Sequence, residues 1–483
     1  MIILPNECYY QIFNNLRNNH RDLFSCSLVN RHWCRIVIPI LWRNPSFYYK
    51  DIRLVRTLLS TLNAKEQSLL IPFKINLPNY PKPLIEYTSY ITSINYYLYF
   101  DGVNNWLRNE KLLNTYELEQ AVRCSLIAMI LRTSKNFKHL NLNQYTCNQL
   151  VFEYLYENTT VTSLNLDLKF TYIDLTCSYN DFKFKALDEA AKIICKNSTL
   201  TSFNIKSIRL GTKGMKKLLD ALYKNTVLNS LGFYDNRIGT EEGKMLANFL
   251  CENTTLKSLY LEENYIGSEG GKALADALYK NTTLTSLDLS RNNLELEGEI
   301  ALANALYKNT SLKNLNLREN NIGSEGGKAL ANALCKNFTL KDLDLSLNEL
   351  GSEGGKALAG ALCKNTTLTT LSLEHNNLGS EGGKALADAL CKNSTLTSLY
   401  LEENNIGSEG GKALADALCK NTTLKYLDLR NNKLGLKGGK ALIDALFKNN
   451  TLTYLDICSN NLGFEVKKVL EDAFPWVIIT EKR

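Results

Sequence analysis

The residues of this chain that could act as metal ligands or nucleophiles are four histidines and thirteen cysteines. The histidines are scattered, and no two of them have the short spacing at which side chains of one helix or turn bind a metal ion. An odd number of cysteines also argues against a complete disulfide framework. We therefore expect no metal site and no disulfides. The histidines are His20, His32, His139 and His375.

Five of the cysteines occupy one position of a repeated pattern, at the end of an expected helix. Tyrosine and phenylalanine fill the same position in other repeats, for example Tyr279 and Phe447. A position that accepts all three residue types is typical of apolar packing, so we expect these thiols to be buried and reduced. The five are Cys251, Cys335, Cys363, Cys391 and Cys419.

Short catalytic motifs give no better candidate for an active site. The sequence contains neither the G-x-S-x-G motif of a hydrolase nor the G-x-x-x-x-G-K-[ST] phosphate loop. The recurring segment GSEGGKAL resembles a phosphate loop faintly, but it occurs in several repeats and its lysine falls within an expected helix. We therefore interpret the chain as a binding protein and not an enzyme, and we expect no cofactor.

Acidic and tyrosine side chains flank the leucines of short predicted strands and could bind a partner. Alternate residues of a strand face opposite sides, so the residues between buried leucines face away from the core. Acidic residues outnumber basic ones at these positions, although the net charge of the chain is +7. This surface either recruits a basic protein segment or only keeps the protein soluble. The candidate substrate-binding residues are Tyr260, Glu262, Glu263, Asp288, Glu374, Tyr400, Glu402, Glu403 and Asp428.

Neither a nucleic acid nor a membrane is an expected partner. Lysines form columns on the expected helices, but many follow an aspartate by four residues, as Lys280 follows Asp276, which favours pairing on the helix surface. No apolar run is long enough to span a membrane, and the start of the chain is unlike a secretory signal. We expect a cytoplasmic or nuclear protein.

The elements that would position these residues are repeats of 28 residues. An asparagine recurs at that spacing from Asn236 to Asn460, within the pattern L-x-x-L-x-L-x-x-N-x-[IL]-G or a close variant of it. Alternating leucines predict a short strand, and the Ala-Leu pairs that follow predict one apolar helix face. One repeat cannot bury both faces, so we expect neighbouring repeats to stack. The asparagine should bond backbone groups that the turn after the strand would otherwise leave unpaired.

This pattern resembles the ribonuclease-inhibitor class of leucine-rich repeats (RNI-like). The resemblance implies an α/β solenoid with a curved parallel sheet inside and helices outside. We expect the repeat domain to span residues 136–483, with twelve strands from Leu140 to Leu455, a thirteenth at Ile94, and a C-terminal cap from Phe464.

Residues 1–45 differ from the repeats and predict about three short helices, with Asp22 and Asn30 as caps of the second and third. The motif order Leu4-Pro5, then Asp22-Leu23, then Leu28-Val29 and two tryptophans resembles an F-box, a small all-α domain. That resemblance implies that Trp33 and Trp42 lie mostly in the domain core. It also implies that the residues contacting a Skp-type adaptor are Leu4, Pro5, Ile12, Leu16, Leu23, Leu28 and Val29.

Residues 46–135 are expected to connect the two domains, with helices and a degenerate first repeat. Asn63 and Glu66 have the spacing of a capping box, and helical sequence runs through 117–131. Ile91, Ile94 and Tyr96 fit the leucine positions of a repeat. Prolines break the chain between these parts at Pro72, Pro78, Pro81 and Pro83.

An F-box followed by leucine-rich repeats resembles the substrate-recognition subunits of SCF-type cullin–RING ubiquitin ligases. The resemblance implies a Skp-type adaptor and, through it, a cullin as partners, a role in ubiquitin-dependent protein degradation, and an unidentified protein substrate on the repeats. Two alternatives stay open. The repeats alone also resemble Ran GTPase-activating proteins, which leaves residues 1–45 unexplained, and the chain could be a plain protein-binding scaffold. Binding to a Skp-type adaptor separates the first interpretation from the other two.

Overall fold

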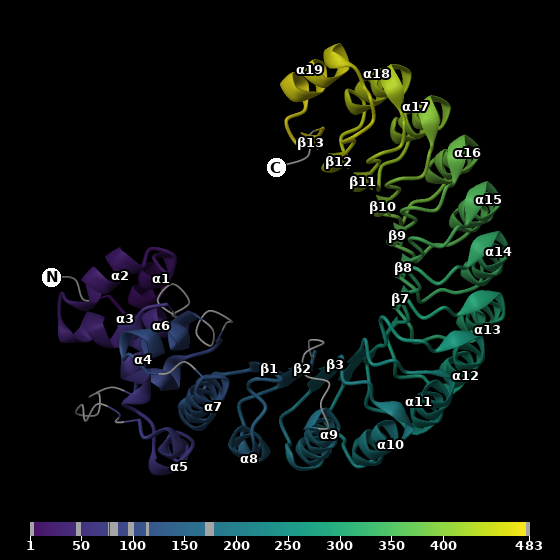
Figure 1. Ribbon diagram of the computed structural model, residues 1–483. Helices are drawn as coiled ribbons and strands as arrows, with labels where there is room; N and C mark the ends of the chain where they lie inside the picture. The colour runs from purple at the N-terminus through teal and green to yellow at the C-terminus, as the bar shows by residue number, and fades with distance from the viewer. Residues whose placement is uncertain are drawn as a thin grey trace. The chain divides into compact units, whose positions relative to one another are not determined.

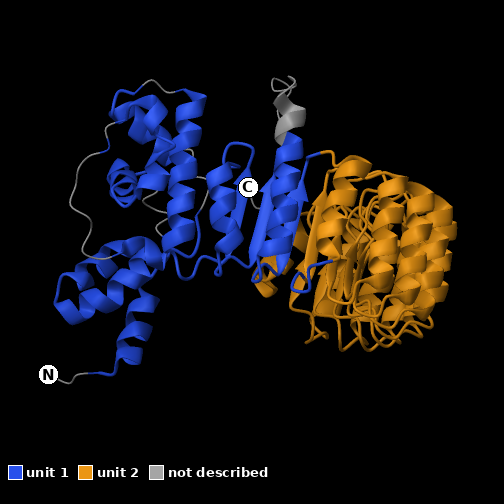
Figure 2. Ribbon diagram, turned by 90° about the horizontal axis from the view of Figure 1, so that it is seen from below, with its two compact units in different colours: residues 1–208, 224–228 blue, residues 209–223, 229–483 orange. Residues whose placement is uncertain are grey.

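A computed structural model of the protein describes residues 4–44, 50–75, 77, 86–94, 101–112, 115–169 and 178–479, with the side chains of 178–182 left out (Figure 1). The chain divides into two compact units (Figure 2). The first comprises residues 1–208 and 224–228, and the second comprises residues 209–223 and 229–483. This division reflects which parts of the chain pack together. The domain boundaries predicted at residues 45 and 135 rest on sequence motifs and stay a prediction.

The first unit begins with the three expected helices, α1 (Asn6–Asn15), α2 (His20–Ser27) and α3 (Arg31–Arg43). Asn30 caps α3, because its side chain accepts a hydrogen bond from the backbone N–H of Trp33. The cap predicted at Asp22 is wrong: α2 begins two residues earlier and is capped by Asn19, whose side chain accepts from the Asp22 N–H.

The connecting region is mainly helical. Its elements are α4 (Ile52–Leu59), α5 (Ala64–Gln67), η2 (Ile71–Phe73), η3 (Tyr87–Tyr90), α6 (Val103–Asn109) and α7 (Tyr116–Thr133). The capping box of Asn63 and Glu66 is confirmed, with both reciprocal hydrogen bonds present. Helix α7 is buried along most of its length. Pro78, Pro81, Pro83 and Tyr96 lie outside the described residues.

The strand predicted at Ile94 is wrong, because the described residues 91–94 bond elsewhere. The N–H and hydroxyl of Thr92 donate to the carbonyl of Arg43 at the end of α3. The Ile91 carbonyl accepts from the Ser134 hydroxyl. This segment therefore ties α3 to the end of α7 and forms no strand of the sheet.

Strand–helix repeats complete the first unit: β1 (His139–Asn143), α8 (Gln149–Glu157), β2 (Ser163–Asp167), α9 (Ser178–Lys196) and β3 (Ser202–Lys206). The strands are parallel, and their leucine positions are in register, Leu140 with Leu164 and Leu164 with Phe203. These side chains are buried against the helices, while the residues between them face outward.

The second unit continues the same pattern in its described residues. Its strands are β4 (Ser230–Tyr234), β5 (Ser258–Tyr260), β6 (Ser286–Asp288), β7 (Asn314–Asn316), β8 (Asp342–Asp344), β9 (Thr370–Ser372), β10 (Ser398–Tyr400), β11 (Tyr426–Asp428), β12 (Tyr454–Asp456) and β13 (Val477–Ile478). Its helices are α10 (Gly211–Leu222), α11 (Thr240–Glu252), α12 (Gly267–Lys280), α13 (Glu295–Lys308), α14 (Gly323–Leu334), α15 (Gly351–Leu362), α16 (Gly379–Leu390), α17 (Gly407–Leu418), α18 (Gly435–Leu446) and α19 (Phe464–Ala473).

The predicted leucine-rich-repeat solenoid is confirmed. In the second unit the strands line the inner, concave side and the helices lie on the outer side (Figure 1). All twelve strands expected between Leu140 and Leu455 are present as β1 to β12. The thirteenth is β13 at the other end of the chain, where Val477 pairs with Leu455 and extends the sheet after the cap helix α19.

The asparagine column bonds the turns of neighbouring repeats, as predicted. Asn320 is fully buried, and its Nδ2 donates to the carbonyls of Leu289, Leu317 and Arg318 at 2.9, 3.1 and 3.3 Å. Its Oδ1 accepts from the N–H groups of Asn292 and Leu294 at 3.0 and 3.3 Å. One side chain thus pairs five backbone groups, of its own repeat and of the repeat before it.

The prediction that the cysteine column is buried is wrong. Cys251, Cys363, Cys391 and Cys419 are exposed, and Cys335 is half-buried. The position lies at or next to the C-terminal end of its helix, beyond the last fully buried leucine, so its side chain faces solvent. All cysteines in the described part of the chain are free thiols.

Glu299 interrupts a column of glycines on the inner side of the helices. The second glycine of the Gly-Gly pair in neighbouring repeats is Gly271 and Gly327, and Glu299 holds that place in α13. Its side chain is fully buried, and neither carboxyl oxygen has a hydrogen-bond partner among the described residues. A Cβ atom added to Gly326 would lie 2.7 Å from Glu299 Oε2, so the carboxyl group fills space between α13 and α14.

Candidate functional site

The helical domain formed by α1, α2 and α3 has a complete core of its own. Phe13, Leu23, Val37 and Ile40 are buried together. Trp33 packs on this cluster, with its ring centroid 5.0 Å from that of Phe13 in an edge-on arrangement. The core is therefore filled without the apolar residues on the outside of the domain.

Most residues expected to contact an adaptor lie on the surface of this domain. Leu4, Pro5 and Ile12 are exposed on and just before α1, while Leu28 and Val29, at the end of α2, are 71% and 59% exposed. Leu16 is half-buried against the core. These residues are apolar side chains that the folded domain leaves in water, as expected of a docking surface.

Leu23 does not belong to this surface, which corrects the prediction. It is fully buried between the helices, so it cannot contact a partner without unfolding the domain. Its neighbour Phe24 is 53% exposed and was missed. The signal was present in the sequence: Leu23 and Ser27 are four residues apart and face inward, while Phe24 and Leu28 have the same spacing one residue later and face outward.

Trp42 also differs from its expected place in the domain core. Its ring stacks on Tyr87 of η3, with centroids 4.7 Å apart and an interplanar angle of 17°. It also lines a cavity of about 450 Å³ together with Phe24, Leu41 and Leu54. Trp42 therefore joins the helical domain to the connecting region.

A second candidate surface is the concave side of the second unit, where tyrosines stack across neighbouring strands. The rings of Tyr426 and Tyr454 are parallel within 6° at 4.0 Å, and Tyr400 lies 4.7 Å from Tyr426. Another pair, Tyr234 and Tyr260, stacks at 6.0 Å. Burial and the neighbouring carboxylates raise the pKa of Tyr400 above its ordinary value.

The acidic residues on this side are partly paired with arginines. Arg430 Nη2 lies 2.7 Å from Glu402 and 2.9 Å from Asp428, which is almost completely buried. The bonds to Asp428 and the nearby carboxylates raise the pKa of Arg430 further. Asp428 and Glu402 are thus both paired with Arg430. Burial raises the pKa of Glu402 above its ordinary value, although Arg430 acts in the opposite direction.

Three of these acids are close enough to share one cation. One carboxylate oxygen from each of Glu374, Glu402 and Asp428 lies within 4.8 Å of the others. Arg430 already bonds two of the three, and Glu374 pairs with Arg318 at 3.4 Å. The guanidinium groups of Arg430 and Arg318 therefore already neutralise part of the negative charge of this cluster.

The other acidic cluster is more open. Glu262 and Glu263 follow β5 in the turn, where Glu262 is half-buried and Glu263 is exposed, and Asp288 pairs across the strands with Tyr260. Arg291 lies 3.8 Å from Glu262 and 2.7 Å from Glu319. Glu403, in the turn after β10, pairs with His375 at 3.3 Å. That these residues bind a substrate stays a proposal.

Comparison with known families gives both parts of the chain an assignment. Residues 1–48 match the F-box-like family, and residues 252–275, 280–303, 308–331 and 336–359 match the leucine-rich repeat family. Residues 349–467 match the TMOD/LMOD leucine-rich domain. No curated protein sequence matches the chain.

Solved structures show distant similarity. A chain of the yeast Rad7–Elc1 complex is 18% identical, with 78% of this chain and 86% of that chain covered and a TM-score of 0.44. LegL7 from Legionella pneumophila is 22% identical, covering 65% of this chain and 98% of that chain, with a TM-score of 0.42. Actin-binding site 2 of leiomodin-1 is 22% identical over 32% of this chain and 87% of that chain, with a TM-score of 0.28. These values are too low to carry an argument about function.

An F-box-like domain followed by a leucine-rich-repeat solenoid defines the class of this chain. It is an F-box/leucine-rich-repeat protein. Such proteins are typically adaptors that bind other proteins and catalyse nothing themselves. None of the helices in the described part of the chain is both long and apolar enough to cross a membrane.

Proposed function

We propose that this protein is the substrate-recognition subunit of an SCF-type cullin–RING ubiquitin ligase. The helical domain would dock on a Skp-type adaptor, and through it on a cullin, while the repeats hold a protein substrate. The observation that carries the proposal is the set of exposed apolar residues on a domain whose own core is already filled. Leu28, Val29, Phe24 and Ile12 all lie on its outer surface.

Exposed side chains of this kind lose their contact with water only when a partner covers them. Fully burying one leucine or phenylalanine contributes about 1.5–3 kcal/mol, and a few such anchors carry most of the energy of an interface. Ile12, Phe24, Leu28 and Val29 are the exposed apolar side chains that would anchor the adaptor. The Ran GTPase-activating and scaffold alternatives give this surface no role.

The adaptor interface is tested by replacing Leu28 and Val29 with alanine. We expect the double variant to bind a purified Skp-type adaptor about 100-fold more weakly or worse, because two exposed anchors are removed without touching the core. Isothermal titration of the full chain measures the affinity. Ile71→Ala is the matched control, since Ile71 is 70% exposed in the same unit but lies outside the helical domain.

Unchanged affinity in the double variant would contradict the proposed interface. Failure of the wild-type chain to bind the adaptor would remove the ligase function altogether. In that case stimulation of GTP hydrolysis by Ran separates the two remaining alternatives.

The concave acids support a substrate with a basic segment. Acidic side chains outnumber the arginines that pair with them along β5 to β12, and strands of a sheet lie about 4.8 Å apart, within the Debye length of about 8 Å at physiological salt. Neighbouring charges therefore reinforce one another and would steer a cationic segment toward the tyrosine stack. Tyrosine rings also bind cations over their faces.

Reversing Glu402 and Glu403 to lysine should weaken the binding of a lysine-rich peptide at least tenfold and reduce its salt dependence. Fluorescence titrations at about 50 mM and about 500 mM salt measure both effects. The matched control is Glu325→Lys with Glu353→Lys, two exposed charges on the outer helices α14 and α15. Equal affinities for all three proteins at both salt concentrations would leave the acids a role in solubility alone.

A further inference from the structure

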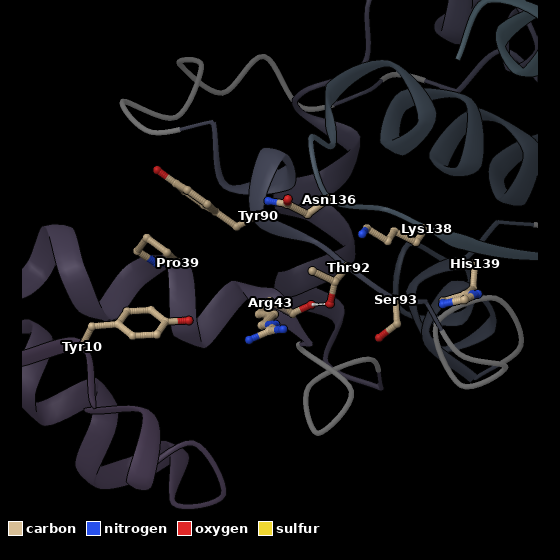
Figure 3. A pocket seen from close by; sticks show the side chains of 9 residues that line it. All are labelled: Tyr10, Pro39, Arg43, Tyr90, Thr92, Ser93, Asn136, Lys138 and His139. Atoms are coloured by element: carbon tan, nitrogen blue, oxygen red, sulfur yellow. Dashed lines mark hydrogen bonds between the residues drawn. The ribbon is translucent and has the colours of Figure 1, made fainter. Parts of the chain in front are cut away.

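A pocket of about 620 Å³ lies inside the first unit, at the place where the helical domain meets the first repeat (Figure 3). Its walls come from α1 and the end of α3, from the segment 90–93, and from the start of β1. The pocket is separate from both surfaces described above, and no part of the proposed ligase function depends on it.

The backbone around the pocket is fixed by hydrogen bonds between segments that are far apart in the sequence. Both the N–H and the hydroxyl of Thr92 donate to the Arg43 carbonyl at 2.9 Å. The N–H of Lys135 donates to the carbonyl of Ser89 at 3.2 Å. The end of α3 and the segment before β1 are therefore each tied to residues 89–92.

The pocket is cationic. Arg43 and Lys138 are exposed and lie on either side of Thr92 in Figure 3, and His139 follows on β1. No carboxylate lines the pocket, and the described residues include no recorded ion pair of either cation. Among the described residues, two exposed positive charges thus line the pocket and no carboxylate does.

Polar side chains add hydrogen-bond donors to these charges. The phenol group of Tyr10 points from α1 toward Arg43, and the side chain of Asn136 also lines the pocket (Figure 3). A planar guanidinium group, an ammonium group, a phenol and an amide around one open space offer donors that match a tetrahedral dianion with several acceptor oxygens. Carboxylate monoanions would use fewer of these donors.

We propose that this pocket binds a phosphate monoester, held by Arg43 and Lys138 with Tyr10 and Asn136 as further donors. The shared chemistry is that of a phosphorylated serine or threonine side chain and of a small free phosphate compound. His139 is the outward-facing first residue of β1, so the site opens onto the strand surface, where an extended phosphorylated segment could continue along the sheet.

The test is calorimetric titration of the full chain with inorganic phosphate, with a phosphoserine-containing peptide, and with the same peptide unphosphorylated. We expect wild-type protein to bind the first two probes and not the third. Arg43→Gln with Lys138→Gln should weaken binding at least tenfold, because both charge-assisted contacts are lost. Arg43→Lys, which keeps the charge but not the two-pronged geometry, should lose less.

Two exposed lysines of α9 in the same unit give the charge-matched control, Lys185→Gln with Lys196→Gln, which should bind like wild type. A phosphopeptide that binds at least tenfold tighter than inorganic phosphate identifies a protein ligand, and equal affinities identify a free phosphate compound. The proposal is overturned if wild type binds neither probe, if the Arg43/Lys138 variant binds like wild type, or if the α9 control loses binding equally. Adaptor binding should be the same in all variants, so the result is independent of the ligase proposal.

Discussion

Replacing Asn320 with alanine should lower the free energy of unfolding by roughly 2–6 kcal/mol. Two buried N–H groups, of Asn292 and Leu294, lose their acceptor, and an unpaired buried group costs about 1–3 kcal/mol. Three carbonyls lose a donor as well. Because both N–H groups belong to the preceding repeat, the damage extends over two repeats. Urea unfolding followed by circular dichroism measures the change.

Asn332→Ala is the control for this experiment. Asn332 is exposed on α14 in the same repeat, so its replacement should change the free energy of unfolding by no more than about 0.5 kcal/mol. Equal unfolding curves for Asn320→Ala and Asn332→Ala would mean that the asparagine column does not hold the repeats together.

The fold could be predicted because the same pattern of buried positions recurs in every repeat. Leu315 and Leu343 hold the same position in successive repeats and are buried for the same reason, so each repeat confirmed the register of the next. The error at Ile94 arose where the pattern occurs only once. There the hydrogen bonds of Thr92 and Ile91 to Arg43 and Ser134 decide the structure, and no local sequence signal reveals such distant partners.

The binding surfaces could be predicted only in part. Helical spacing could have separated Leu23 from Phe24, since the two lie on different faces of α2. Pairing between Arg430 and the acids of adjacent strands needs the register of the sheet, and burial of Asp428 needs its packing. The cationic pocket combines Tyr10, Arg43, Thr92 and Lys138 from four stretches of the chain, so only the folded structure brings them together.

Replacing Glu299 should also have a large effect on the free energy of unfolding, but it should raise this free energy, whereas replacing Asn320 should lower it. Burial raises the pKa of its carboxyl group from 4.5 to about 9, so the folded protein holds a proton that the unfolded chain releases at neutral pH. Because the pKa is raised on folding, the free energy of unfolding falls as pH rises from about 4.5 to about 9. One pKa unit corresponds to about 1.4 kcal/mol, so the loss at pH 7 is roughly 3 kcal/mol.

Glu299→Ala should therefore stabilise the protein, by an amount that grows with pH up to about pH 9 and is smallest below pH 4.5. Alanine keeps the Cβ that α13 already accommodates and favours the helix, while the unpaired carboxyl group is removed. Glu299→Gln separates the two causes: it retains a polar group of similar volume that does not titrate, so its stability should stay low but lose the pH dependence. The test is to measure the free energy of unfolding of wild type and both variants at about pH 5, about pH 7 and about pH 9. Parallel pH profiles for wild type and both variants would show that Glu299 is ionised in the folded protein and that the space between α13 and α14 is open to water.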